Sequence, residues 1–316
     1  MTEAIKGAKF LIDKQIGEGK IYTFGEAFST YQKVYAATNE NIAGYVNLVD
    51  TTNKEKVLSV LSSGDHVFNL ITNDVFNIDT FDSNALTEYY ALGLRRALIL
   101  KYNYYDYFKA IVILTTSYSV DEVTEIIKGL LPYMEENHKI FWEQIINYNY
   151  RIQKLRLRKL NLLKMLCLTA EDVLIKNDYN NYLLNETTYE KLRTNLKLAN
   201  ISFKNCNALY LDKNFENKTY DAILLSNIID YFYKAYGSLW GIDLFNKYVN
   251  KLIKLSNNNA LLFLNYMYYY MPNSKFNPEL IKCSTIKETD FEDEIVFPVV
   301  GERTRGGVIL KKVNKE

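Results

Sequence analysis

The sequence predicts an α/β fold built on a doubly wound, mostly parallel sheet. Short apolar segments typical of buried strands recur along the chain, at residues 56–61, 75–81, 202–211, 220–226 and 260–266. Helical patterns separate several of these segments, and strands that alternate with helices favour a parallel sheet. Two more strand patterns, at 281–287 and 307–313, have no helix between them. We therefore expect seven strands, with an antiparallel pair at one edge of the sheet.

Helical patterns precede and interrupt this sheet. We expect residues 1–53 to form an N-terminal helical segment, because aromatic and aliphatic residues recur there at three- and four-residue spacing. Residues 54–316 are expected to form the α/β domain. Residues 101–199 show no convincing strand pattern, so we expect a large helical insertion at that point of the domain.

Local signals mark where individual helices begin and end. Residues 84–100 have the apolar spacing of an amphipathic helix. Ser119–Glu122 and Thr187–Glu190 match the spacing of a capping box, so helices are expected to follow them. Gly129 and Pro132 predict a break in a long helix.

Composition argues against several classes of protein. The 316 residues carry 38 basic and 37 acidic side chains, and a net charge of +1 gives no global attraction for nucleic acid. Three separated cysteines and two histidines argue against a zinc site and fit a reducing compartment. There is no leader pattern and no apolar run of ~18 residues. We expect a cytoplasmic protein with no metal centre and no membrane-spanning helix.

The stretch KVLSVLSSGDHVFNLI (56–71) reads as a strand, a tight polar turn and a helix. In the turn, Gly64 lacks a Cβ, so a ligand can approach the backbone. The N–H groups at a helix start favour a negative group, but a carboxylate at Asp65 would repel a pyrophosphate. Ser62, Ser63, Gly64 and Asp65 are therefore expected to cradle a ligand that carries both a cation and a carboxylate.

An acidic residue follows the second predicted strand, in the segment NIDTFDSN. Asp82 lies eighteen residues after Gly64, and an acid about twenty positions beyond a glycine turn commonly binds a ribose diol. Asp79 competes for this role, but Asp82 stands directly before the helix expected near Asn84. Asn84 is a further candidate for the same site, although asparagine is also a good helix N-cap.

Polar residues also follow the next two predicted strands. Asn207 lies where an amide can read an adenine amino group, and Ser226 and Asn227 end the fourth strand. Ligands of open parallel sheets bind at the carboxyl ends of the strands. We therefore expect Ser226 and Asn227 at the reactive edge of the pocket.

Together these segments resemble the class I, S-adenosylmethionine-dependent methyltransferase-like fold. A narrower resemblance is spread over roughly residues 39–310, in ENIAGYVN, VLSVLSSGDHVFNL, FDSNALTEYYALGLRRA, LLSNIIDYF and GERTRGG. These segments are similar to the diacylglycerol 3-amino-3-carboxypropyl transferases of betaine-lipid synthesis and their uncharacterised relatives. The chain departs from that family in lacking a proline after the Asn of DSNAL and in having a less glycine-rich first turn.

The resemblance implies a transferase that uses S-adenosylmethionine. Attack at the γ-carbon of the amino acid side would transfer a 3-amino-3-carboxypropyl group, which is the favoured reaction, to a small-molecule or lipid acceptor. Attack at the methyl carbon would make the protein a small-molecule methyltransferase, and a catalytically silent cofactor-binding protein is a third reading. Stable nucleic-acid binding is not expected, because SNII lacks the proline-aromatic edge of base-modifying enzymes.

Three further features complete the expected site and its surroundings. Glu40 is expected to close over the cofactor from the N-terminal segment, and Arg303 and Arg305 to grip an acceptor carboxylate or phosphate. The segment RIQKLRLRKLNLLKM (151–165) has six basic residues and no acid. It fits a peripheral contact with an anionic membrane or with nucleic acid, but the favoured interpretation is a solvated helix with its leucines in the core.

Overall fold

The computed structural model describes residues 2–21, 32–46, 54–168, 179–228, 232, 236–267, 291–301 and 304–315. The chain divides into two compact units. The first is drawn from residues 1–39, 61–68 and 82–197. The second is drawn from residues 40–60, 69–81 and 198–316. The N-terminal helix and the helical insertion, which the sequence places in separate parts, thus belong to the same unit.

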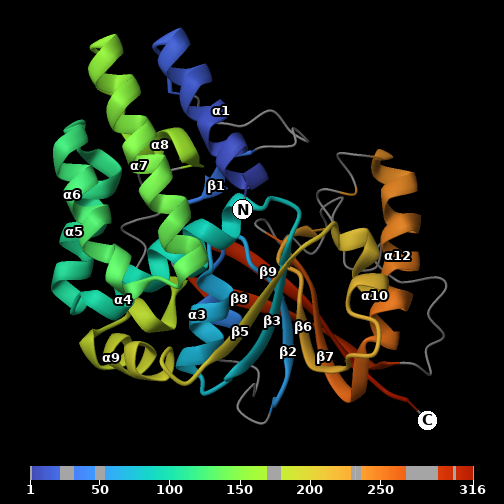
Figure 1. Cartoon of the computed structure of the whole chain (residues 1–316). Helices are drawn as coiled ribbons and strands as arrows, with labels where there is room; N and C mark the ends of the chain where they lie inside the picture. The colour runs from blue at the N-terminus through green and yellow to red at the C-terminus, as the bar shows by residue number, and fades with distance from the viewer. Residues whose placement is uncertain are drawn as a thin grey trace. The chain divides into compact units, whose positions relative to one another are not determined.

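A seven-stranded sheet forms the centre of the second unit (Figure 1). Its strands are, in spatial order, β5 (Asn200–Asn205), β3 (Asn77–Asp82), β2 (Val57–Val60), β6 (Tyr220–Leu224), β7 (Ser256–Met267), β9 (Thr304–Val313) and β8 (Phe291–Gly301). β2 pairs in parallel with β3 and β6, and β6 pairs in parallel with β7. β9 runs antiparallel to both β7 and β8. The predicted α/β class with a mostly parallel sheet and an antiparallel edge pair is confirmed.

The strand order reverses in the middle of this sheet. From β2 the chain moves outward to β3 and β5, and it then returns to the other side of β2 as β6. Open parallel sheets bind ligands at the carboxyl ends of the strands beside such a reversal. For β2 and β6 these ends are Val60 and Leu224.

Helices of the second unit bury the apolar side chains of this sheet. The unit contains α2 (Ile42–Val46), the last part of α3 (Asp65–Thr72), α10 (Leu211–Asn214) and α12 (Ser238–Lys254). Phe245 and Val249 of α12 share a buried core with Ile223 and Leu262 of the strands. Burying each such side chain contributes about 1.5–3 kcal/mol, so this face holds β6 and β7 in place.

The first unit is mainly helical. Within its described residues it contains the first part of α3, together with α1 (Thr2–Glu18), a π-helix (Glu88–Arg95), α4 (Arg96–Lys101), α5 (Tyr104–Thr116), α6 (Val120–Leu130), α7 (Glu136–Arg156), α8 (Leu162–Leu166) and α9 (Glu186–Asn195). Short 3-10 turns occur at Leu131–Tyr133 and Asn181–Leu183 here, and at Ala208–Tyr210 in the second unit. Figure 1 shows α1 and α7 side by side. β1 (Val34–Tyr35) pairs in parallel with β4 (Cys167–Leu168), so the insertion contains a short strand that the sequence did not reveal.

Two of the expected helix signals act as predicted, and one is displaced. Ser119 caps α6, since its hydroxyl accepts a hydrogen bond from the Glu122 N–H, at 3.2 Å. The helix ends before Pro132, as expected. The prediction for Thr187–Glu190 was wrong by two residues: Asn185 caps α9 and makes the capping box with Thr188. Asparagine is the stronger N-cap, which explains the earlier start.

The expected single helix over 84–100 is also revised. Residues Glu88–Arg95 form a π-helix before α4 begins. The indole N–H of Trp142 donates to the backbone oxygen of Tyr89, at 2.8 Å, and so satisfies a carbonyl within the widened turn. π-Helical turns are rare and occur often at functional sites.

Strand boundaries differ where turn residues intervene. β5 ends at Asn205, whereas a strand was expected as far as residue 211, because Asn207 starts a 3-10 turn there. The strand expected at 281–287 lies outside the described residues, and the edge strand that is described is β8. Among the described residues, no helix is both long and apolar enough to cross a membrane.

Candidate functional site

The turn after β2 holds two residues in the left-handed backbone region. Ser62 has φ 45° and Gly64 has φ 91°. A Cβ on Gly64 would lie 3.0 Å from the Ala91 Cβ and 3.1 Å from a ring carbon of Phe68. The glycine is therefore required by its backbone conformation and by protein packing. This corrects the expectation that the missing Cβ opens the backbone to a ligand.

Asp65 anchors the turn from inside the first unit. Its carboxylate accepts hydrogen bonds from the Thr38 N–H at 2.6 Å, the Ser63 hydroxyl at 2.6 Å and the Tyr182 hydroxyl at 2.5 Å. It also forms an ion pair with Arg95 at 2.9 Å. Burial raises the pKa of Asp65, but the Arg95 charge and the hydrogen bonds outweigh burial and lower it below its ordinary value. The structure thus gives this fully buried carboxylate an internal anchoring position, whereas the sequence suggested ligand contact.

Arg95 completes this buried network, and the sequence analysis missed it. Its guanidinium donates to the Ser63 carbonyl at 2.8 Å and to the Tyr182 hydroxyl at 2.6 Å. It also lies over the Phe68 ring, 5.4 Å from the centroid. An arginine inside the apolar stretch YYALGLRRALIL was the available signal, because a buried arginine needs an acidic partner.

Asp82 lies at the end of β3 and is partly exposed. Its two carboxylate oxygens accept backbone hydrogen bonds, from the Ser62 N–H at 3.1 Å and from the Asn84 N–H at 2.9 Å. Burial raises the pKa of Asp82 to about 6, and the backbone hydrogen bonds only partly oppose that effect. Through the Ser62 N–H, Asp82 contacts the turn that follows β2.

Asn84 has a local structural position. Its side-chain oxygen accepts from the Leu86 N–H at 3.1 Å, and its side-chain amide donates to the Gln32 carbonyl at 2.9 Å. These contacts match the capping role that the sequence left open. They also tie residues 82–86 to the segment before β1.

Asp79, the competitor of Asp82, is held by side chains of the second unit. Its carboxylate accepts from the Tyr220 hydroxyl at 2.7 Å, from the Lys218 ammonium at 3.0 Å and from the Ser202 hydroxyl. Although burial raises the pKa of Asp79, these partners lower it overall. Asp79 therefore joins β3 to β5 and β6.

Glu40 and Ser226 meet in the second unit, although 185 residues separate them in the chain. The Ser226 hydroxyl donates to the buried Glu40 carboxylate. Ser226 follows β6 and has φ 59°, a left-handed conformation that costs an L-residue free energy. Such strained residues cluster at functional sites. Asn227 follows directly and is partly exposed, with its amide oxygen 3.3 Å from the Ser226 hydroxyl.

The remaining predicted residues have no demonstrated part in a site. Asn207 is exposed, and its side chain caps the 3-10 turn by accepting from the Leu209 N–H at 2.9 Å. Arg303 lies outside the described residues. Arg305 lies in β9, but its side chain is likewise outside what the structure describes.

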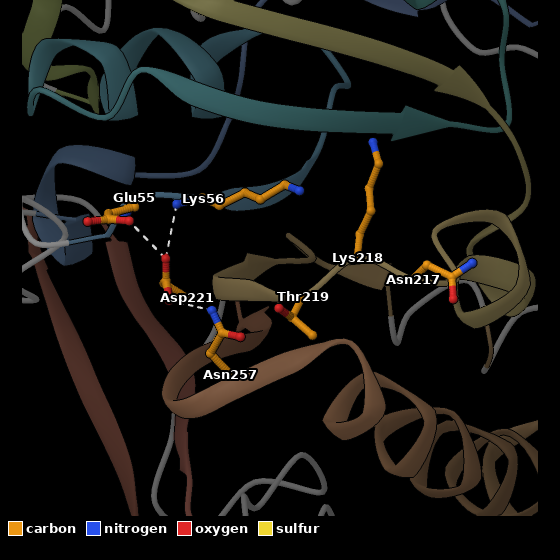
Figure 2. A pocket seen from close by; sticks show the side chains of 7 residues that line it. All are labelled: Glu55, Lys56, Asn217, Lys218, Thr219, Asp221 and Asn257. Carbon is orange, nitrogen blue, oxygen red and sulfur yellow. Dashed lines mark hydrogen bonds between the residues drawn. The ribbon is translucent and has the colours of Figure 1, made fainter.

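A polar pocket of about 420 Å³ lies at the opposite end of the strands, where β2 and β6 begin (Figure 2). Asp221 lines this pocket, and its carboxylate accepts hydrogen bonds from the backbone N–H groups of Glu55 at 3.1 Å and Lys56 at 3.0 Å. It also accepts from the Asn257 amide at 2.7 Å. These contacts fix the starts of the strands. Ligands of parallel sheets bind at the other end, so we do not assign this pocket to the reaction.

Searches among known proteins place the chain in no family: no family model and no curated protein matches it. Within the described residues, His, Cys, Asp and Glu do not gather in groups of three or more that could hold a metal ion. The functional interpretation therefore rests on the strand order, the turn after β2 and the residues at the strand ends.

Proposed function

We propose that the protein is an S-adenosylmethionine-dependent transferase, favoured as a 3-amino-3-carboxypropyl transferase with a small-molecule or lipid acceptor. The observation that carries this proposal is Asp82. It is a partly exposed carboxylate, held by backbone N–H groups at the turn after β2, at the end of the adjacent strand β3. A ribose diol needs such a hydrogen-bond acceptor.

The sheet supports the same proposal. Its strand order reverses between β2 and β6, and an antiparallel strand, β9, lies between β7 and β8. Seven strands, mostly parallel with an antiparallel pair at one edge, support the methyltransferase-like sheet that we propose. Ser62, two residues after β2, and Ser226, two residues after β6, are left-handed, and strained backbone is common where ligands bind.

The residues fit a nucleoside cofactor in part. A carboxylate has about four lone-pair sites, so Asp82 can accept hydroxyl groups beside its backbone donors. Asp65 does not fit direct contact, because it is fully buried among four protein donors. Its proposed task is to hold the turn, so that the Ser62 N–H meets Asp82.

S-Adenosylmethionine supplies an activated carbon next to a sulfonium, and the protein contributes mainly positioning to such a displacement. Asp82 orients the nucleoside through its ribose. We assign Glu40 to the ammonium of the amino acid part, since a carboxylate and a cation attract strongly in a water-poor site. Ser226 and Asn227 orient the acceptor with their hydroxyl and amide groups. Proton removal is needed only if the acceptor must ionise.

The nucleoside product distinguishes the favoured reaction from its competitors. Purified protein is incubated with S-adenosylmethionine and an extract of small molecules and lipids, and nucleosides are identified by mass spectrometry. We expect methylthioadenosine above the background without protein, together with an acceptor that gains the aminocarboxypropyl mass. S-Adenosylhomocysteine would instead make the protein a methyltransferase. Cofactor binding without either product would point to the silent cofactor-binding protein and contradict the transferase proposal.

Glu40 offers a second test of the same assignment. Glu40→Gln keeps the shape of the side chain but removes the charge that attracts an ammonium. We expect S-adenosylmethionine to bind about tenfold more weakly, while adenosine affinity stays the same. Equal loss for both ligands would place Glu40 in a purely structural role. Glu216→Gln, at an exposed glutamate of the same unit, is the matched control.

A further inference from the structure

The end of α7 presents cations and leucines to solvent. The sequence suggested one amphipathic helix over 151–165, but α7 ends at Arg156 and α8 begins only at Leu162. Residues 154–159, with the sequence KLRLRK, are all exposed, and we call them the basic–leucine tip. Leu155 is 80% exposed and Leu157 is 90% exposed. By contrast, Leu162 and Leu163 of the same segment are buried.

A buried glutamine fixes the shape of this tip. The Gln153 side chain donates to the Leu160 carbonyl at 2.7 Å and accepts from the Leu160 N–H at 2.7 Å. It also donates to the Asn149 side chain at 2.8 Å. The backbone of Arg158 closes the helix end by donating to the Gln153 carbonyl at 3.1 Å. The tip is therefore a turn whose two flanking residues, Gln153 and Leu160, are hydrogen-bonded to each other.

Leu157 occupies a position that a leucine does not favour. Its φ of 50° is left-handed, and helices usually place glycine or asparagine at this position after their last turn. A leucine here adds backbone strain and exposes an apolar side chain, so the fold gains nothing from it. Strained residues of this kind point to a function outside the fold.

The tip itself is positively charged, through Lys154, Arg156, Arg158 and Lys159. Lys154 has an acidic neighbour, Asp121, at 3.4 Å. Arg156 and Arg158 lie against Gly17 and Gly19 at the end of α1, where Glu18 is exposed. Figure 1 shows that α1 and α7 reach the same end of the first unit. The segment 151–165 still contributes six basic residues and no acid.

We infer that the basic–leucine tip docks the protein on an anionic lipid bilayer. Its leucines insert among the lipids while its cations contact the negatively charged headgroups. Nucleic acid would use the cations alone, and two leucines exposed between them would add nothing to phosphate contacts. Docking is independent of the transferase reaction proposed above, because it needs neither cofactor nor acceptor.

Vesicle sedimentation of the full chain tests this inference. The probes are phosphatidylcholine vesicles with and without phosphatidylglycerol. We expect binding to the anionic vesicles that weakens as salt rises, and little binding to the neutral ones. Leu155→Gln combined with Leu157→Asn should weaken binding about tenfold or more, because the inserted apolar surface is lost. Lys159→Gln should weaken it about fivefold.

Matched variants and an alternative ligand complete the test. Asparagine suits a left-handed position, so the double variant should unfold at the same temperature as the wild type or higher. Leu155→Gln alone, within the regular helix, replaces the double variant in the test if the double variant is unstable.

Leu198→Gln is the matched surface control, because it changes a leucine that is 70% exposed elsewhere, and it should leave vesicle binding unchanged. No binding to anionic vesicles, or equal binding by the leucine variants, overturns the inference. Binding to single-stranded RNA that depends on Lys159 but not on the leucines would assign the tip to nucleic acid instead.

Discussion

Asp65 and Asp82 flank the same turn, yet they differ in exposure, in their charged and hydroxyl partners, and in the direction of their pKa shifts. Asp65 is fully buried and is held by Arg95 and by hydroxyl donors, which lower its pKa. Asp82 is partly exposed and accepts from backbone N–H groups, and burial raises its pKa to about 6. The first arrangement stabilises the fold, whereas the second maintains a carboxylate that a ligand can reach.

The contrast shows that position in a motif does not decide the role of an acid. Asp65 begins the helix after the glycine turn and Asp82 ends the next strand, and the sequence predicts ligand contact for both. The Arg95 guanidinium and two hydroxyl donors hold Asp65 in the protein interior.

Asp65→Asn should have the largest effect on stability. It removes the negative partner of Arg95 and leaves a buried positive charge, which costs about 3–5 kcal/mol in the free energy of unfolding. Denaturant unfolding measures the loss. Asp243→Asn, at an exposed pair with Lys247, should change stability by less than about 0.5 kcal/mol. Similar small changes for both variants would show that Asp65 does not anchor the turn.

The two acids should also respond oppositely to pH. The pKa of Asp65 is lower in the folded than in the unfolded protein, so its contribution is present above about pH 4 and is lost as the pH falls through its folded pKa. The pKa of Asp82 is raised, so its charged form costs stability above about pH 6 and that cost disappears as the pH falls toward pH 4. The free energy of unfolding of Asp82→Asn, measured between about pH 4 and pH 6, should not show the stability gain that protonation of Asp82 gives. If the variant still gains stability as the pH falls, another group causes the gain.

Cofactor binding should follow the ionisation of Asp82. A ribose diol donates to the carboxylate form, so the dissociation constant of S-adenosylmethionine should rise about tenfold between about pH 7 and pH 5. Calorimetric titration at several pH values measures this change. In Asp82→Asn the dissociation constant should no longer depend on pH in this range. If it still does, Asp82 is not the group that causes the pH dependence.

Ser63→Ala probes one contact of the buried network. The change removes a hydroxyl that donates to Asp65 at 2.6 Å, and hydrogen bonds to charged groups contribute about 1.5–3 kcal/mol. We expect a loss of stability within that range, smaller than that of Asp65→Asn. In the double variant Asp65→Asn, Ser63→Ala, the second change should cost much less. Full additivity would show that the hydroxyl does not act through Asp65.

Ser62→Gly should have the smallest effect, and in the opposite direction. Glycine accepts the left-handed φ of 45° without strain, so we expect a gain of about 0.5–1 kcal/mol. Ser62→Ala removes the same hydroxyl but retains a Cβ, and it should bring no such gain. If alanine stabilises the protein as well as glycine does, backbone strain is not the cause.

The central strands of the sheet were predictable because they have strong local patterns. Val57–Val60 and Tyr220–Leu224 are short apolar runs with nearly complete burial, and both were found within a few residues. The π-helix at Glu88–Arg95 was not predictable, since its apolar spacing resembles that of an ordinary helix. The displaced start of α9 shows that two adjacent capping signals cannot be ranked by spacing alone.

The candidate site was predictable only in part. Chain order placed Asp82 and Ser226 at the ends of strands, where the structure has them, but tertiary contacts decide what each of them does. The Asp65–Arg95 pair joins residues thirty positions apart, and no local pattern connects them. No local pattern shows the packing at Gly64 either, where the missing Cβ makes room for Ala91 and Phe68.

The most direct test of the account is calorimetric titration of S-adenosylmethionine into three proteins near neutral pH: the wild type, Asp82→Asn and Asp243→Asn. We predict binding by the wild type, equal binding by Asp243→Asn and binding at least about tenfold weaker by Asp82→Asn, with all three folded. Failure of the wild type to bind, or unchanged affinity in Asp82→Asn, would contradict the assignment of the turn after β2 to this cofactor.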